Sequence, residues 1–200
     1  MKSLQLLLVV TAVLQLTACS KTVQWEEEVP LNTGETIWVK RSVVYSRQGG
    51  AGNPFDIAYR PESDQSITFT WNGKEYHYEG DARIMVLAIS PDKVPVLIAR
   101  AEDSDWRARH HYACTIPYYV QLVPDVSGQV WTWPTKIDAW TYNQPANLLL
   151  QRHAPEQMKK RYTAADRQSE DASGSIQFAS KQRVDANFTG DLCENPRSKK

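Results

Sequence analysis

Alternation of apolar and polar side chains is clearest over residues 36–45 (TIWVKRSVVY). The apolar residues that share one side of an extended chain there are Ile37, Val39, Val43 and Tyr45. Polar Arg41 interrupts that side. β-branched and aromatic residues dominate the segment, so the pattern predicts a strand.

A β-hairpin is predicted at residues 67–78 (ITFTWNGKEYHY). Asn72 and Gly73 both accept the positive φ of a type I′ turn, and a two-residue turn pairs Phe69 with Tyr76. One face of this hairpin then holds the apolar side chains of Ile67, Phe69, Trp71, Tyr76 and Tyr78. The other face is suited to water and holds Thr68, Thr70, Glu75 and His77.

Two nearly continuous apolar runs follow at residues 83–89 and 94–99. Such runs are typical of strands covered on both faces or of a buried helix, and their β-branched residues favour strands. Pro95 is expected at a strand start or edge. Three further strands are predicted, at residues 111–123 with a break at Pro117, at 129–133 and at 137–142. Short strands separated by turns indicate a mainly β domain, an antiparallel sandwich or a small barrel.

Other segments lack strand patterning. Residues 47–66 are punctuated by Gly and Pro and are expected to form a long loop. A short helix is predicted at Pro155–Tyr162, because Pro is well placed in a first helical turn. Residues 163–187 contain few large apolar side chains, so an extended, partly disordered C-terminal tail is expected.

Composition narrows the classes of function. The 200 residues include 23 basic and 23 acidic side chains, a formal net charge of zero. Nucleic-acid-binding domains are normally basic, so no nucleic-acid partner is expected. The motif Gly-x-Ser-x-Gly of hydrolases is absent, and no residue set assembles a recognisable catalytic site. We therefore expect a protein that is not an enzyme and needs no cofactor.

The N-terminus has the features of an export signal. Lys2 precedes an apolar run at Leu4–Leu16, which is shorter than the roughly 20 residues needed to span a bilayer. The sequence Leu16-Thr17-Ala18-Cys19 that follows resembles the lipobox of bacterial lipoproteins.

That resemblance implies diacylglycerol on the Cys19 sulfur, cleavage before Cys19 and acylation, with palmitate, of the new N-terminus. Two or more acyl chains hold a protein stably on a membrane. Ser20 stands where an Asp would favour retention in the inner membrane. The resemblance therefore implies the outer membrane, facing the periplasm, with surface exposure left open.

Two cysteines remain after lipidation of Cys19. Cys114 and Cys193 are expected to form a disulfide in the oxidising periplasm, and two buried free thiols are the alternative. No Cys-x-x-Cys occurs, and no His lies at ligand spacing from either cysteine, so no metal site is expected.

Aromatic residues are the only hint of a ligand. Trp131, Trp133 and Trp140 lie close together in the sequence and could present rings to a sugar or a partner protein. The alternative is that they fill the core. Glu26–Glu28 are interpreted as a solvated spacer near the anchor, and His110 and His111 as ordinary surface or edge histidines on a strand.

Most of the mature chain also resembles an uncharacterised family of proteobacterial lipoproteins. The segments that carry this resemblance are residues 21–39, YRPE at 59–62, AISP at 88–91, PYYVQLVPD at 117–125 and WTWP at 131–134. The resemblance implies a lipoprotein and no particular activity.

Four regions are thus predicted: a signal peptide at 1–18, a lipidated N-terminus and spacer at 19–35, a β-domain at 36–150, and a polar tail with a short helix at 151–200. The expected function is a structural or protein-interaction role for a membrane-anchored lipoprotein that faces the periplasm, with an envelope protein as partner. The alternative is a module that binds glycan or peptidoglycan through an aromatic face.

Overall fold

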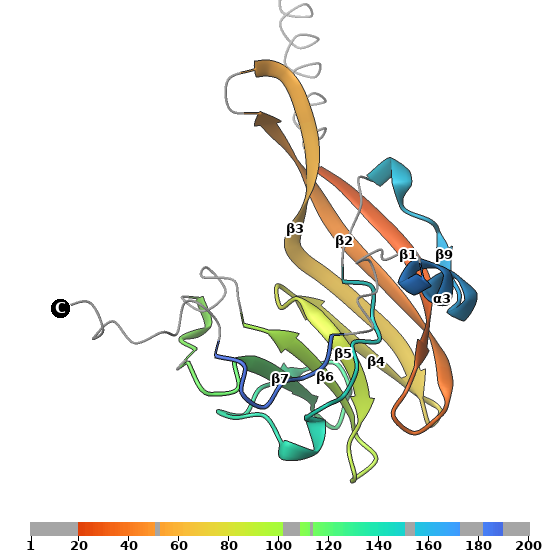
Figure 1. Ribbon diagram of the computed structural model, residues 1–200, viewed down its shortest axis with the longest axis vertical. Coiled ribbons are helices and arrows are strands. Elements are labelled where there is room, and N and C mark those ends of the chain that lie inside the picture. The colour runs from red at the N-terminus through yellow and green to blue at the C-terminus, as the bar shows by residue number, and fades with distance from the viewer. Residues whose placement is uncertain are drawn as a thin grey trace, which may run out of the picture.

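Two β-sheets packed face to face form the body of the protein (Figure 1). The computed structural model describes residues 20–50, 53–101, 109–112, 114–150, 155–172 and 182–189. The mainly β sandwich predicted from the sequence is confirmed.

The larger sheet has five strands in the order β4-β3-β2-β1-β9. These are β1 (Ser20–Pro30), β2 (Thr36–Gly50), β3 (Asn53–Trp71), β4 (Lys74–Gly80) and β9 (Arg161–Tyr162). The smaller sheet, in the order β5-β6-β7-β8, contains β5 (Ile84–Ile89), β6 (Pro95–Arg100), β7 (Tyr119–Pro124) and β8 (Trp131–Thr132). Neighbouring strands are antiparallel, except that β9 runs parallel to β1.

The predicted hairpin is present with its predicted register. Asn72 and Gly73 have φ values of 49° and 75°, as a type I′ turn requires. Phe69 pairs with Tyr76, and their rings stack with centroids 5.3 Å apart. His77 lies on the opposite face, where its ring contacts Thr68.

Replacing Gly73 with Val should destabilise the domain by about 1 kcal/mol or more, because β-branched residues resist positive φ. A Cβ at position 73 would meet no heavy atom within 4 Å, so the cost is conformational rather than steric. Urea unfolding of the Gly73→Val and Thr70→Ser variants measures the difference. Equal stability of the two variants would contradict the turn assignment.

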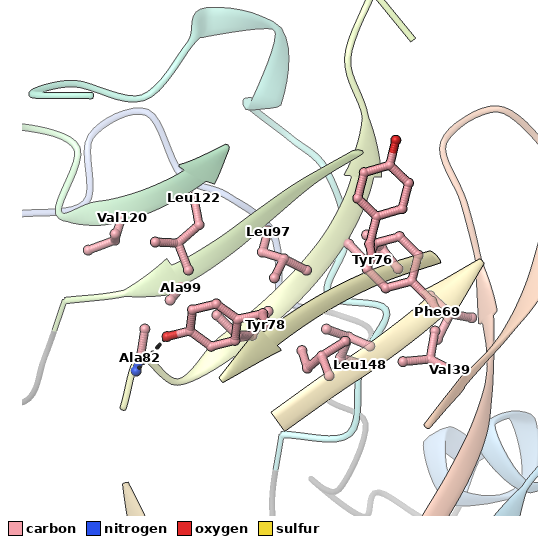
Figure 2. Close-up of a cluster of buried hydrophobic side chains, with 14 of the residues drawn as sticks. Val39, Phe69, Tyr76, Tyr78, Ala82, Leu97, Ala99, Val120, Leu122 and Leu148 are labelled. Atoms are coloured by element: carbon pink, nitrogen blue, oxygen red, sulfur yellow. Dashed lines mark hydrogen bonds between the residues drawn. The ribbon is translucent and has the colours of Figure 1, made fainter. Parts of the chain in front are cut away.

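The main core lies between the two sheets. Figure 2 shows Val39, Phe69, Tyr76 and Tyr78 from the larger sheet gathered with Leu97, Ala99, Val120, Leu122 and Leu148. Strands β5 and β6 are also covered on their far face, where Met85, Val86 and Ile98 pack against Ile137 and Val184. This double cover explains the continuous apolar runs and confirms both predicted strands, with Pro95 at the start of β6.

Two segments predicted to lack regular structure are strands. The expected spacer at 19–35 contains β1, which pairs with β2 along its whole length. The expected loop at 47–66 instead continues β2 and β3 as a paired arm that extends away from the sandwich (Figure 1). Gly49, Gly50 and Pro61 lie at register shifts, where they do not prevent pairing.

Strand boundaries in the middle of the chain also differ from the prediction. Among the described residues of 111–123, only β7 is a strand, and the bond before Pro117 is cis. Residues 137–142 form no strand and contain the 3₁₀ helix η1 (Ala139–Thr141). The Asp138 backbone carbonyl accepts bonds from the Thr141 amide and hydroxyl, which closes this turn locally.

The C-terminal region is more ordered than expected. Pro155–Gln157 form only the 3₁₀ helix η2, and the longer helix is α3 (Ala164–Ala172). Thr163 and Asp166 bond reciprocally at its start, a capping box that stabilises a helix N-terminus. Hydrogen bonds from Lys159 and Thr163 lower the pKa of Asp166 to about 2.

Parts of the expected polar tail therefore belong to the sandwich. Tyr162 and Val184 are buried, and Arg167 of α3 donates to the backbone carbonyls of Glu28 and Asn147. Residues 173–181 and 190–200 of the tail lie outside the described residues.

Candidate functional site

The larger sheet has one face turned away from the core, here called the outer face. A single row of side chains crosses all five strands of this face, and it consists of Arg161, Glu26, Lys40, Thr68 and His77. A second row consists of Gln24, Ser42, Ser66 and Glu79. Because side chains alternate along each strand, these polar residues share one surface while their neighbours fill the core.

Trp38 and Arg161 form an aromatic and cationic pair at one side of the outer face. The Trp38 residue is 39% exposed, although large aromatic side chains are usually buried. The Arg161 guanidinium lies 4.2 Å from the centroid of the indole ring. Its Nη2 also lies 3.0 Å from a carboxylate oxygen of Glu26. The pair is therefore held in place before any partner arrives.

Hydroxyl groups occupy the middle of the outer face. The Oγ atoms of Ser42 and Ser66 are 2.7 Å apart, and Thr68 Oγ1 is 2.8 Å from His77 Nδ1. The other ring nitrogen of His77 lies 3.7 Å from a Glu79 carboxylate oxygen. The centre of this surface thus offers donors and acceptors between charged margins.

Three adjoining hollows mark the outer face. The largest, of about 610 Å³, is lined by residues that include Lys40, Ser42 and Thr68. A second hollow of about 430 Å³ shares Lys40 and Thr68 with it and reaches Trp38, and a third of about 220 Å³ lies towards Glu79. Together they form a continuous shallow surface on the sheet.

A buried polar network lies directly beneath this surface. Arg41, predicted as an interruption of the apolar face, is buried there and donates to Glu27 at 3.0 Å and to Gln65 at 2.8 Å. The other Glu27 oxygen accepts the Leu149 amide at 2.9 Å. The interpretation of Glu26–Glu28 as a solvated spacer is therefore wrong at Glu27, whose residue is 0% exposed.

The structure does not assemble the three tryptophans chosen from the sequence into one platform. Trp131 packs on the main core, and its indole N–H donates to the His77 carbonyl at 2.6 Å. Trp133 is 38% exposed and meets the His110 ring edge-on. Trp140 packs on the far side of the smaller sheet and donates to Asp138.

Trp131 has a structural contact that can be tested by itself. Trp131→Phe keeps an aromatic ring and removes the N–H that satisfies the edge strand β4, so it should cost about 1 to 2 kcal/mol. Trp133→Phe should change stability by less than about 0.5 kcal/mol. Thermal unfolding of both variants compares them, and a Trp131→Phe protein as stable as its Trp133 counterpart would refute this role.

The other predicted site residues lie apart from the outer face. Cys114 packs against the main core, while Cys19 and Cys193 lie outside the described residues. The pairing of Cys114 with Cys193 therefore stays a prediction. His110 is helical rather than extended, so the expected strand is wrong there, and its ring lies 3.0 Å from Asp81.

The sequence predicts about half of the outer face. Thr68, Thr70, Glu75 and His77 were expected to face water, but Trp38 and Arg161 were not singled out. Trp38 lies on the polar side of the 36–45 alternation, which was a readable signal. Arg161 carries no such signal, because it joins the sheet through a two-residue strand.

Within the described ranges, no cluster of three or more His, Cys, Asp or Glu side chains could hold a metal ion. The same residues contain no helix with the length and apolar character to cross a membrane. No family model, curated protein or solved structure matches the chain.

Proposed function

We propose that the protein is a lipid-anchored lipoprotein of the outer membrane that faces the periplasm and binds an envelope protein through the outer face. The observation that carries the binding role is the exposed Trp38, stacked by Arg161, beside the hollows of the larger sheet. Trp and Arg are the residues most often found at the energetic centre of protein interfaces. Mixed charges and hydroxyls around such a centre provide the polar rim.

A binding role fits this surface better than catalysis. Thr68 and His77 pair across the β3–β4 ladder, and the Thr68 hydroxyl and the His77 imidazole hydrogen-bond to each other. This bond gives the two side chains a structural role within the hairpin. The hollows around them are broad and shallow, which suits contact with an extended partner surface.

The binding surface is tested by site-specific photocrosslinking in cells. A photoreactive residue in place of exposed Thr70, which lines the same hollow as Trp38, should trap the partner. Trp38→Ala should weaken binding by about tenfold or more, as truncation of a central interface residue does. Trp133→Ala is the matched control, since the two tryptophans are 39% and 38% exposed. Equal adduct yields from the two variants would rule out the outer face as the interface.

A glycan ligand is the second candidate for the same surface. The observation that favours it is the group of hydroxyls at Ser42, Ser66 and Thr68 beside an exposed indole. Soluble peptidoglycan fragments would then compete with the crosslink at Thr70 and bind the isolated protein in a manner that depends on Trp38. If the fragments neither compete nor bind, a glycan ligand is excluded and an envelope protein remains the proposed partner.

The anchor proposal rests on the apolar run and on Leu16-Thr17-Ala18-Cys19. Cys19→Ala should abolish labelling with a fatty-acid probe and move the protein out of the detergent phase. Ser20→Ala, one residue later, should leave both properties unchanged. Labelling that persists in Cys19→Ala would exclude the anchor.

We also propose that Cys114 pairs with Cys193. The bond would join the main core to the C-terminal end of the chain, and a loop of this length allows roughly 4 kcal/mol of stabilisation in the chain-entropy model. Mass spectrometry of an unreduced digest should find the two peptides joined. Free alkylation of both cysteines in the native protein would exclude the pairing.

A further inference from the structure

The paired arm of β2 and β3 reaches past the beginning of β1. Ser20 pairs with Ser46, which itself pairs with Arg60. The β2–β3 ladder continues beyond this point through Arg47 to Gly50. Four residues of extended chain measure about 13 Å, and Figure 1 shows the arm leaving the sandwich in this direction.

The same end of the molecule carries the proposed lipid anchor. Cys19 immediately precedes Ser20, and β1 begins at Ser20 without a spacer. Acyl chains on Cys19 would therefore hold this end of the sandwich directly against the bilayer. The headgroup layer on each side of the hydrocarbon is only about 5 to 8 Å thick, so an arm that extends about 13 Å past the anchor meets lipid.

We propose that the β2–β3 arm, residues 47–50 and 53–60, rests in the headgroup layer of the membrane beside the acylated Cys19. This inference depends on the proposed anchor. Tyr59 lies at the base of the arm and packs against the buried cluster that includes Trp25, Val43 and Tyr45. Further along, the arm sequence contains the apolar residues Phe55 and Ile57, which suit a lipid surface. The arm would then orient the domain, because two contacts, the acyl anchor and the arm, restrict its rotation on the membrane.

Charge at the base of the arm supports contact with anionic headgroups. Arg47 and Lys21 are exposed at the Ser20 end of the sheet. The Lys21 ammonium lies 4.9 Å from the centroid of the Tyr59 ring, which ties the beginning of β1 to the arm. It also pairs with Glu156 at 3.1 Å, so Arg47 is the stronger candidate for a headgroup contact. Basic side chains close to an anionic leaflet are attracted to it.

The test uses the complete lipidated protein in vesicles of phosphatidylethanolamine and phosphatidylglycerol. Ala58→Cys in the arm is labelled with nitrobenzoxadiazole, and Gln48→Cys, which pairs with Ala58 across the ladder, gives a second position. Thr33→Cys is the control, because Thr33 is exposed in the turn at the opposite end of β1. Unsubstituted protein should take up no label.

Dithionite added to the outside water reduces label that it can reach. We expect reduction at Ala58 and Gln48 to be several-fold slower than at Thr33, with emission shifted to shorter wavelength. Phe55→Ser combined with Ile57→Ser should restore fast reduction at Ala58 while the protein still floats with the vesicles.

The outcomes separate the two proposals. Protein that floats with the vesicles but is reduced equally fast at all three positions overturns the arm contact and leaves the anchor standing. Protein that does not float overturns the anchor and, with it, the arm contact.

Discussion

Arg41→Met should lower the free energy of unfolding by about 3 to 5 kcal/mol, because it removes one partner of a buried ion pair. Arg41 Nη1 lies 3.0 Å from Glu27 Oε1, and neither side chain is exposed. Methionine occupies a similar space but leaves the Glu27 carboxylate without its nearest counter-charge. Arg167 Nη2 lies 3.9 Å from the other Glu27 oxygen, which is too long for a hydrogen bond, so it does not replace the bond that Arg41 donates.

The neighbouring residue supplies the control for this prediction. Lys40 is the next basic residue on the same strand, and it points to the outer face, where it is exposed. Lys40→Met should change stability by less than about 0.5 kcal/mol. Urea unfolding of both variants makes the comparison, and similar losses would show that the ion pair does not stabilise the fold.

A double variant separates the ion pair from the packing around it. Arg41→Met combined with Glu27→Leu removes both charges of this pair, while Arg167 keeps its hydrogen bonds to the backbone carbonyls of Glu28 and Asn147. The double variant should be more stable than either single variant, since replacing a whole buried pair with apolar side chains is often nearly neutral. Additive losses would contradict the coupling.

Asn147→Leu should destabilise the protein by about 3 kcal/mol, because it leaves more than one buried backbone group without a partner. The Asn147 amide accepts the Leu87 N–H at 2.8 Å and donates to the Leu87 carbonyl at 2.7 Å. It also donates to the Pro30 carbonyl at 2.8 Å, so one side chain joins the two sheets.

The same substitution should expose an edge strand. β5 is the end strand of the smaller sheet, and Asn32 makes the equivalent pair of bonds to Ile89, two residues further along. Two amide side chains thus cover alternate positions of an edge that could otherwise pair with another chain. Light scattering on warming should show earlier aggregation of Asn147→Leu than of the exposed control Asn187→Ala. Identical scattering would exclude the edge-covering role.

Local patterns account for the elements that were predicted well. The 67–78 hairpin rests on a two-residue turn, so its register follows from neighbouring residues alone. The runs at 83–89 and 94–99 are apolar on both faces, which is typical of strands covered on both sides, and their β-branched residues favour strands over a buried helix. In both cases the information lies within about a dozen residues.

Readable local signals were also missed. Thr163 and Asp166 have the spacing of a capping box and mark the start of α3. The helix was instead predicted at Pro155–Tyr162, from the preference of Pro for a first helical turn. Residues 23, 25 and 29 alternate as apolar positions with Glu27 between them, which is a strand pattern with one polar interruption. The acidic run around Glu27 obscured it.

The candidate site was predictable only in part. Thr68, Thr70, Glu75 and His77 follow from the hairpin register, and they form one half of the outer face. The other half needs β1 and β9, whose pairing brings Arg161 beside Glu26 across 135 residues of sequence. No local pattern encodes that contact.

By itself, the sequence determined the β class of the protein and the turn at Asn72–Gly73, because these depend on backbone preferences. It also determined the alternation that separates the core face from the outer face, because this depends on side-chain periodicity. It also showed that Arg41 interrupts an apolar face, but not whether that charge would be buried or solvated. Only the tertiary structure decided this. Burial of a charge is tolerable only with a partner at hydrogen-bond distance. For Arg41 these partners are Glu27 on β1, Gln65 on β3 and the Leu149 carbonyl, which meet only when the three strands pair and the Leu149 segment packs on them.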